Sequence, residues 1–299
     1  MSNNKSDPLV SIVLPTRNRA SMIEECIKSC LNQTYRNIEL IVVDESTDET
    51  PQILERLAIN DKRIQVYQEA CGNLPAALNY GFRWTRGDFL TWMCDDDIYE
   101  PDAIEIMVNE LRGRPDIGLV YCDFKNIDNE GNVLNVEKRG DISEMDYKSV
   151  VGRCILYRRS VYAKIGDYSV DDWLNEDDEY WLRVRDHFQI YHIDASPYRY
   201  RLHDSTLTEV LRCEAIIAQH RTWAKRAKNS YQSRRIMGTG YLMASNLALF
   251  RRGKSIALRF AVKGFISNPF QIGLLKFGVK FFFPKKIIDA LWKRKRHLK

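Results

Sequence analysis

The sequence has no run of eighteen uncharged apolar residues, so it predicts no transmembrane helix. It also has no apolar segment after Met1 of the kind that forms a secretion signal. The cysteines number seven, an odd count, and their positions do not follow metal-ligand spacing. Such cysteines are typical of a reducing compartment, so we expect a cytoplasmic protein.

Glycine is missing from the loop that follows the first predicted strand, residues 15–20. A dinucleotide-binding fingerprint and a P-loop both need glycines at this place, so neither motif is present. A sugar-1-phosphate nucleotidyltransferase would also need a glycine-rich loop there and is therefore the weaker alternative. An aspartyl-phosphate phosphatase is disfavoured because its paired aspartates would follow the first strand, not the fourth.

Acidic residues are almost absent from the last part of the chain. Residues 221–299 carry 20 Lys+Arg and a single acid, Asp289, whereas residues 1–220 carry 25 Lys+Arg and 39 Asp+Glu. The overall net charge of +5 hides this division. We therefore expect a change of function or environment near residue 220.

The first half of the chain alternates two hydrophobic patterns. Four segments have the apolar pattern of strands, residues 10–14, 38–43, 64–68 and 87–97. Three segments between them have the pattern of helices, residues 21–33, 50–60 and 74–85, and Ser21 with Glu24 forms a capping-box signature at the first of these. Strands joined through helices form right-handed crossovers, so the sequence predicts an α/β fold with a mostly parallel sheet flanked by helices.

Three consecutive acids, Asp95, Asp96 and Asp97, end the fourth strand segment. Neighbouring carboxylates repel by about 1 kcal/mol or more per close pair, so a compensating cation is expected. A hard divalent ion with oxygen ligands fits best. The alternative is a solvated loop or an N-cap for a helix that follows Pro101.

The carboxyl ends of parallel strands meet at one edge of a sheet, where ligands bind. Polar loops at residues 16–19, 44–48, 70–72 and 95–97 should therefore form one crevice. Arg17 and Arg19 could contact a phosphate or a ring edge there, or could simply be solvated. Asp44 ends a buried strand and needs a hydrogen-bond donor, such as a base NH or a ribose hydroxyl, unless it caps the turn at residues 47–51.

Several motifs in a fixed order carry a resemblance to a known family. They are Val10 to Asn18, Gln33 to Tyr35, Glu39 to Asp48, Gly72 to Gly81, the acidic stretch, and Gly166 to Tyr168 followed by Glu176 to Arg183. This series, over roughly residues 9–210, resembles the family 2 glycosyltransferases, which are inverting nucleotide-sugar enzymes. The resemblance implies the GT-A (Rossmann-like) fold, a nucleoside-diphosphate sugar donor, commonly UDP-linked, and Mg²⁺ or Mn²⁺ at the acidic motif.

The resemblance also implies roles for individual residues. The implied donor contacts are Pro15, Thr16, Arg17, Asn18, Asp44, Glu45, Asn79, Asp95 and Asp96. The implied metal ligands are Asp95, Asp96, Asp97 and His203, where His203 could instead be structural. Two departures leave alternatives open: the family's usual first acid falls at Cys94 under one alignment, and either Asp44 or Glu45 could read the base.

The predicted helix at residues 176–183 carries the candidate general base, Asp177. The positive end of the helix dipole favours an ionised carboxylate at this position, and the matching acid of the family deprotonates the acceptor. A simple N-terminal helix charge is the alternative for Asp177. The preceding loop, residues 167–175, holds Asp171, Asp172 and Trp173, which are residue types that contact sugar rings.

The basic tail predicts helices at residues 241–252, 255–267 and 270–282. Arg259 and Lys263 share one face of the second helix, while Ile256, Val262, Phe265 and Ile266 are assigned to the opposite face. Such helices suit an anionic lipid interface, so we expect peripheral attachment to the inner face of the plasma membrane. The alternative is that the apolar faces pack on the catalytic domain.

The sequence thus predicts a disordered leader at residues 1–8, a GT-A domain at residues 9–210 and a helical, basic region at residues 211–299. Its predicted activity is inverting transfer of a sugar to a hydroxyl of a carbohydrate or lipid-linked acceptor, in cell-surface polysaccharide or glycolipid assembly. A nucleotidyltransferase and a non-enzymatic basic binding protein are the alternatives. No nucleic-acid partner is expected, because the tail has no recognised binding motif.

Overall fold

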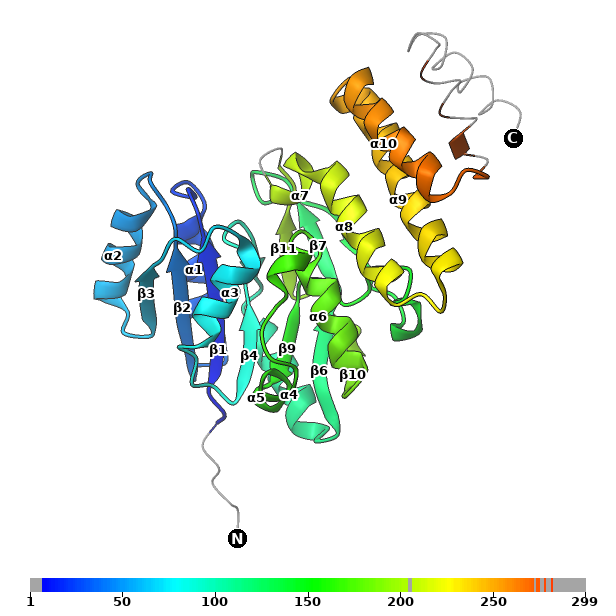
Figure 1. Cartoon of the computed structure of the whole chain (residues 1–299). Coiled ribbons are helices and arrows are strands. Elements are labelled where there is room, and N and C mark those ends of the chain that lie inside the picture. Colours follow the sequence, from blue (N-terminus) through cyan, green and yellow to red (C-terminus); the bar gives the residue numbers. More distant parts are fainter. Residues whose placement is uncertain (1–6, 204–205, 272, 275–276, 278–280, 282–299) are drawn as a thin grey trace. The chain divides into compact units, whose positions relative to one another are not determined.

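A computed structural model describes residues 7–203, 206–271, 273, 274, 277 and 281 (Figure 1). The chain divides into two compact units, residues 1–203 and residues 204–299. Most of the predicted leader, most of the predicted helix at residues 270–282 and the basic end at residues 285–299 lie outside the described residues.

The first unit is built on a seven-stranded sheet with the order β10-β6-β9-β4-β1-β2-β3. Its strands are β1 (Val10–Thr16), β2 (Ile38–Asp44), β3 (Ile64–Gln68), β4 (Phe89–Trp92), β6 (Ile117–Cys122), β9 (Ile155–Arg158) and β10 (Gln189–Ile193). All neighbouring pairs are parallel except those of β9, which runs antiparallel to β4 and to β6. The predicted α/β fold with a mostly parallel sheet is confirmed.

Helices cover this sheet and bury its central strands. They are α1 (Ile23–Leu31), α2 (Thr50–Asn60), α3 (Leu74–Phe82), α4 (Ala103–Gly113), α5 (Arg159–Ile165) and α6 (Glu176–Arg185). Every residue of β1 and of β2 is buried, which is why both strands are nearly continuous apolar runs. The predicted capping box is wrong, because α1 begins at Ile23 after Met22 and has no side-chain cap.

A second sheet, which the sequence did not reveal, has the order β5-β11-β7-β8. Its strands are β5 (Ile98–Tyr99), β7 (Phe124–Ile127), β8 (Val133–Glu137) and β11 (Tyr198–Arg201). The strand predicted at residues 87–97 therefore ends early, at Trp92, and the chain then crosses from the first sheet to the second. The three acids lie in this crossing, residues 93–97.

The second unit is helical in its described part, with α7 (Leu207–Val210), α8 (Arg212–Lys225), α9 (Ser230–Arg251) and α10 (Lys254–Ser267). Small side chains allow α9 and α10 to pack closely, since Ala244 and Ala248 meet Ala257 and Ala261 in one buried cluster. Among the described residues, no helix is both long enough and apolar enough to cross a membrane.

Gly81 sets the distance between α3 and the first sheet. A Cβ atom at this position would lie 2.5 Å from Val13 Cγ1 and 3.1 Å from Val43 Cγ2. We expect Gly81→Ala to lower the free energy of unfolding by about 1–3 kcal/mol, as overpacking does, although alanine favours helices by about 1 kcal/mol. Urea denaturation followed by circular dichroism measures the change.

Gly113, in the last turn of α4, is the matched control, because a Cβ atom there would have no neighbour within 4 Å. Gly113→Ala should be neutral or slightly stabilising. Equal stability of the two variants would show that α3 can shift on the sheet without cost.

Candidate active site

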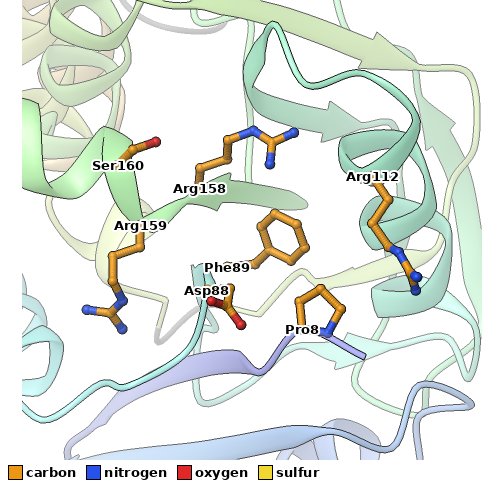
Figure 2. Close-up of a pocket in the computed structure, with 7 residues that line it drawn as sticks. All are labelled: Pro8, Asp88, Phe89, Arg112, Arg158, Arg159 and Ser160. Carbon is orange, nitrogen blue, oxygen red and sulfur yellow. The ribbon is translucent and has the colours of Figure 1, made fainter. Parts of the chain in front are cut away.

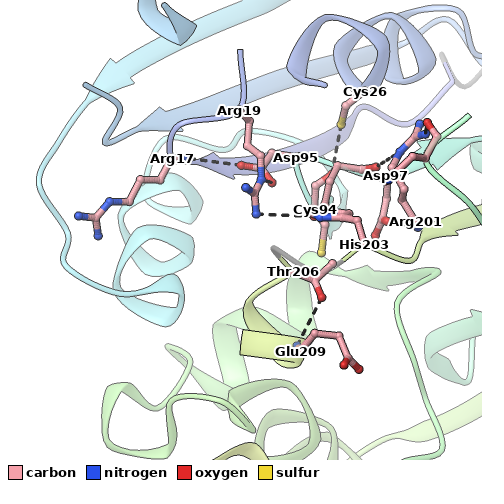
Figure 3. Close-up of polar contacts among 12 residues, drawn as sticks. Arg17, Arg19, Cys26, Cys94, Asp95, Asp97, Arg201, His203, Thr206 and Glu209 are labelled. Carbon is pink, nitrogen blue, oxygen red and sulfur yellow. Dashed lines mark hydrogen bonds and ion pairs between the residues drawn. The ribbon is translucent and has the colours of Figure 1, made fainter. Parts of the chain in front are cut away.

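The acidic turn lies at the carboxyl end of β4, at the edge of the sheet where the ends of β1 and β2 also lie. One potential ligand atom from each of Cys94, Asp96 and Asp97 lies within 4.8 Å of the others. Figure 3 shows Arg17 and Arg19 on one side of this turn and Arg201 on the other. The turn is thus a concentration of negative charge with basic side chains around it.

Asp97 is fully buried and holds the turn against β11. The Tyr198 hydroxyl donates a hydrogen bond of 2.7 Å to its Oδ2, and the Arg201 backbone N–H donates one of 2.9 Å to its Oδ1. Burial and the charge of Asp96 nevertheless raise the pKa of Asp97 to about 7. Both oxygens of this predicted metal ligand are therefore already used within the protein.

Asp95 is bound by the loop after β1. The Arg17 backbone N–H donates to its Oδ2 over 3.3 Å, and the Arg19 Nε–H donates to its Oδ1 over 3.2 Å. Burial and the Asp96 charge raise the pKa of Asp95 to about 6, although the Arg19 charge opposes this rise. Part of the compensating positive charge expected from the sequence therefore comes from a guanidinium.

Asp96 meets His203, which is 107 residues away in the sequence. His203 Nε2 lies 3.0 Å from Asp96 Oδ2, and both side chains are almost fully buried. The antiparallel register of β5 with β11, in which Tyr99 faces Tyr198, brings the two residues together because each lies just beyond the paired segment. A carboxylate oxygen and an imidazole nitrogen, two groups that can each ligate a divalent ion, therefore lie within hydrogen-bond distance of each other.

Cys94 is the third group of the cluster and is a poor ligand for a hard ion. Burial and the charge of Asp97 raise the pKa of its thiol well above the ordinary value, so the sulfur keeps its proton. A protonated thiol does not suit Mg²⁺ or Mn²⁺. The residues that fit such an ion best are Asp96 and His203, with Asp97 adjacent to them.

Asp44 ends β2 beside Thr16, the last residue of β1, and Pro15 lies one residue earlier in the same register. Its Oδ1 accepts a hydrogen bond of 3.0 Å from the Ser46 N–H, as a turn-capping aspartate does. Its Oδ2 is buried and has no hydrogen-bond partner among the described residues. Asp44 thus caps the turn and also keeps one oxygen for a donor group.

Glu45 is held by two neighbouring loops. Its Oε2 accepts a hydrogen bond of 3.1 Å from the Gly72 N–H, and its Oε1 lies 3.9 Å from Arg17 Nη1. Asn18 adopts a left-handed conformation, with φ of 55°, and its Oδ1 accepts from the Thr47 N–H over 2.8 Å. The loops after β1, β2 and β3 therefore meet at one place, as predicted from the sequence.

Asn79 lies apart from the other predicted donor contacts. It is buried in α3, where its Nδ2 donates to the Tyr168 carbonyl and its Oδ1 accepts from the Tyr168 N–H, both over 2.8 Å. This pair of bonds uses both ends of the amide and ties α3 to the loop that leads to α6. Its observed contacts are structural.

Asp177 lies in the first turn of α6, where its Oδ1 accepts a hydrogen bond of 2.8 Å from the Asp178 N–H. The chain enters this helix through Leu174, whose φ of 74° is strained for a branched side chain. In the preceding loop, Asp171 and Trp173 are exposed, whereas Asp172 is buried. The half-buried carboxylate of Asp177 therefore follows a loop that carries an exposed aromatic ring.

Sequence reasoning missed two charged residues of this region, Glu176 and Arg153. Glu176 is buried, and its Oε2 has no hydrogen-bond partner among the described residues. Burial and the Asp177 charge raise the pKa of Glu176 to about 8. Neither residue stands out in the sequence as functional. Glu176 belongs to a run of four acids, which is an ordinary pattern for the first turn of a helix, and Arg153 follows a glycine of the kind found in many turns.

One cavity lies away from all of these residues, at the amino ends of β1 and β4 (Figure 2). It has a volume of about 640 Å³ and is lined by Pro8, Asp88, Phe89, Arg112, Arg158, Arg159 and Ser160. None of the predicted site residues lines it. Because ligands of parallel sheets bind at the carboxyl ends of strands, the acidic edge remains the candidate active site.

Comparisons with known proteins show the family to which the chain belongs. The model of glycosyl transferase family 2 matches residues 11–166, so the chain belongs to this family and is a glycosyltransferase. An uncharacterised glycosyltransferase of Rickettsia typhi is 30% identical over 265 residues, which is 84% of this chain and 82% of that protein. The family assignment favours the glycosyltransferase prediction over both alternatives.

Two solved structures share the fold at low sequence identity. Residues 1–349 of TarS from S. aureus have a TM-score of 0.59 at 16% identity and cover 87% of this chain and 81% of that one. The mannosyltransferase PcManGT from Pyrobaculum calidifontis has a TM-score of 0.58 at 17% identity, with 94% and 88% covered. The fold is GT-A, as the sequence predicted.

The buried carboxyl of Glu176 should make stability depend on pH. Its pKa is about 8 in the folded protein against 4.5 ordinarily, so between these values the folded chain keeps a proton that the unfolded chain has lost. The free energy of unfolding should therefore fall as the pH rises from about 4.5 to about 8. A pKa difference of one unit corresponds to about 1.4 kcal/mol. Between these two pH values, the free energy of unfolding of Glu176→Gln should therefore rise by at least about 2 kcal/mol relative to that of the wild type.

Urea denaturation at a series of pH values measures the difference. Glu55→Gln is the control, because Glu55 is exposed on α2. Parallel stability curves for the wild type and Glu176→Gln would mean that Glu176 is already ionised in the folded protein.

Proposed function

We propose that the protein transfers a sugar, with inversion, from a nucleoside-diphosphate sugar, UDP-linked by preference, to a hydroxyl of an acceptor. The observation that carries this proposal is the pairing of Asp96 with His203 over 3.0 Å at the carboxyl edge of the sheet. The TarS fragment has been solved with UDP-GlcNAc, and PcManGT with GDP-Man and Mn²⁺. These complexes support a nucleotide-sugar donor and a divalent ion.

Asp96 and His203 would hold Mg²⁺ or Mn²⁺, with Asp97 behind them. When bound, the ion supplies positive charge to the diphosphate of the donor. Asp44 Oδ2, which no described residue hydrogen-bonds, and Glu45 are the acceptors for the NH of the base or for a ribose hydroxyl. Arg17 and Asn18 belong to the same converging loops.

Asp177 is the proposed general base. Its carboxylate takes the proton of the acceptor hydroxyl as the oxygen attacks the anomeric carbon, and the nucleoside diphosphate leaves from the opposite face. A single displacement of this kind inverts the configuration of the sugar carbon. Trp173, exposed just before α6, is proposed to stack on the acceptor sugar.

The acceptor is proposed to be a growing polysaccharide or a lipid-linked sugar. A chondroitin synthase of Escherichia coli is 36% identical over 132 residues, which cover 44% of this chain but only 19% of that protein. This similarity supports a role in cell-surface polysaccharide or glycolipid assembly.

The test is turnover of a panel of UDP- and GDP-sugars with Mn²⁺, measured as release of the nucleoside diphosphate. At least one donor should be consumed, and EDTA should abolish the activity. Asp177→Asn should keep its fold and its affinity for the nucleotide but lose turnover by roughly 10² or more, as loss of a general base does. Circular dichroism and titration with UDP or GDP check the fold and the affinity.

Asp186→Asn, at the other end of α6, is the matched control and should keep normal turnover. Near-normal turnover by a folded Asp177→Asn variant would remove Asp177 from the role of base. Activity that persists in EDTA would argue against the divalent ion, and no turnover of any donor would count against the proposed function.

We also propose that the second unit attaches the enzyme to an anionic membrane surface. α10 has two apolar faces: Ala257 and Ala261 are buried against α9, whereas Leu258, Val262, Phe265 and Ile266 are exposed on another face. Ile256, which the sequence assigned to the lipid side, packs against the helical core instead. The exposed stripe is therefore an apolar surface that the described part of the second unit does not cover.

Exposed cations flank this stripe. On the helical repeat of α10, Lys254 lies at one border of the apolar stripe, while Arg259 and Lys263 lie at the other. α10 contains no acid. An apolar stripe bordered by cations suits a helix that lies in an anionic lipid interface, where each basic residue contributes about 1 kcal/mol.

Sedimentation with lipid vesicles tests this attachment. The double variant Phe265→Gln/Ile266→Gln should bind vesicles of phosphatidylcholine and phosphatidylglycerol about tenfold more weakly than the wild type, because two exposed apolar side chains are lost. High salt should weaken wild-type binding, since the cations are then screened.

The control is Ile59→Gln/Val170→Gln, which removes two exposed apolar side chains of the first unit. It should sediment like the wild type, and pure phosphatidylcholine should bind all three proteins weakly. Equal binding of both double variants to anionic vesicles would mean that the α10 stripe is not the anchor.

A further inference from the structure

Arg153 lies in a loop that Arg139 holds in place. The Arg139 Nε–H donates a hydrogen bond of 2.7 Å to the Val150 carbonyl, and Nη2 donates one of 2.6 Å to the Ser149 carbonyl. Gly152 has a φ of 74°, and a Cβ atom there would lie 3.0 Å from Arg139 Nε. The chain just before β9 is therefore fixed closely against a guanidinium, and Arg153 follows directly.

The Arg153 side chain lies between the acidic turn and β11. Its Cζ is 4.3 Å from the centre of the Tyr200 ring, and its Nη1 is 3.5 Å from Cys94 Sγ. A thiol is a weak hydrogen-bond acceptor, so this contact satisfies little of the hydrogen-bonding capacity of the guanidinium. None of the ion pairs found among the described residues involves Arg153, and its other N–H groups donate to no described residue.

The charge of Arg153 acts on two parts of the site. It opposes the effect of burial on Asp97, in the acidic turn, and also on Glu176, in the first turn of α6. Asp97 adjoins the Asp96–His203 pair, and Glu176 adjoins Asp177. The charge of Arg153 is therefore felt beside the proposed ion site and beside the proposed base, while the guanidinium itself lies against Cys94 in the acidic turn.

The other arginines around the turn are engaged differently. Arg19 bonds Asp95, and the side chain of Arg17 is 65% exposed. The guanidinium of Arg201 donates to the carbonyls of Asp96 and Asn129 and to Glu25. Among the arginines around the acidic turn, Arg153 therefore combines a sheltered position with donors that the described residues leave unused.

We propose that Arg153 binds the diphosphate of the sugar donor and stabilises the negative charge that the leaving group acquires. This inference rests on the proposed function. The bond between the anomeric carbon and the diphosphate oxygen breaks, its electron pair stays on that oxygen, and guanidinium N–H groups donate to the phosphate oxygens. The acceptor oxygen forms the new bond to carbon, and its proton goes to Asp177. Arginine suits this task because its planar fork matches phosphate oxygens.

Binding of UDP and of uridine, each with Mg²⁺ present, tests the proposal. Arg153→Gln should weaken the binding of UDP by about 10- to 100-fold, which is the usual effect of losing charge-assisted hydrogen bonds. It should leave the affinity for uridine, which has no phosphate, within about twofold of the wild type. Calorimetry measures UDP, and ligand-observed nuclear magnetic resonance measures uridine. Arg153→Lys keeps the charge without the fork and should recover part of the lost UDP affinity.

Arg199→Gln is the matched control, because Arg199 is the neighbour of Tyr200 on β11 but pairs with Glu100. It should bind both ligands like the wild type. If Arg153→Gln does not fold, the ratio of UDP to uridine affinity in Arg153→Lys decides, and it should be lower than in the wild type.

Equal weakening of UDP and uridine would assign Arg153 a structural role and overturn the inference. Unchanged UDP binding by a folded Arg153→Gln variant would overturn it as well, while leaving the proposed function intact. Failure of the wild-type protein to bind UDP or GDP at all would overturn the proposed function and, with it, this inference.

Discussion

The arrangement of the site depends on a buried carboxylate, Asp97. An ionisable group inside a protein needs hydrogen bonds, and both bonds to this one come from β11, from the Tyr198 hydroxyl and from the Arg201 backbone. The acidic turn is therefore fixed to the second sheet as well as to the first. Beside this junction, Asp96 contacts His203 over 3.0 Å.

Charge balance around the turn explains why so many cations gather at this edge. Arg19 binds Asp95, the Arg201 side chain contacts the Asp96 carbonyl, and Arg153 lies against Cys94. These guanidinium groups lower the cost of burying three neighbouring acids. The same positive groups lie around the turn beside which we place a diphosphate, so the charges that balance the acids would also favour an anionic donor.

Periodic patterns in the sequence predicted β1 to β3, the helices between them and the edge of the sheet that carries the site, because each of these features is local. The second sheet escaped prediction for physical reasons. β5 has two residues, too few for a pattern, and every residue of β8 is exposed or partly exposed. The clustering of acids indicated a concentration of charge, but not that Asp97 would be buried and hydrogen-bonded to Tyr198. Asn79 likewise gave no sign that both ends of its amide bond Tyr168, since that contact spans 89 residues.

The pairing of β5 with β11 has a consequence for the synthesis of the protein. Tyr99 is synthesised about a hundred residues before its partner Tyr198. The acidic turn therefore cannot bind to β11 until most of the first unit has been made. Contacts between residues that are far apart in the sequence form late, because closing the long loop between them costs conformational entropy before the contact adds any stability. A nascent chain that ends before Tyr198 lacks both His203 and the strand that holds Asp97. The growing polypeptide thus completes its acidic site only when nearly all of the first unit has emerged.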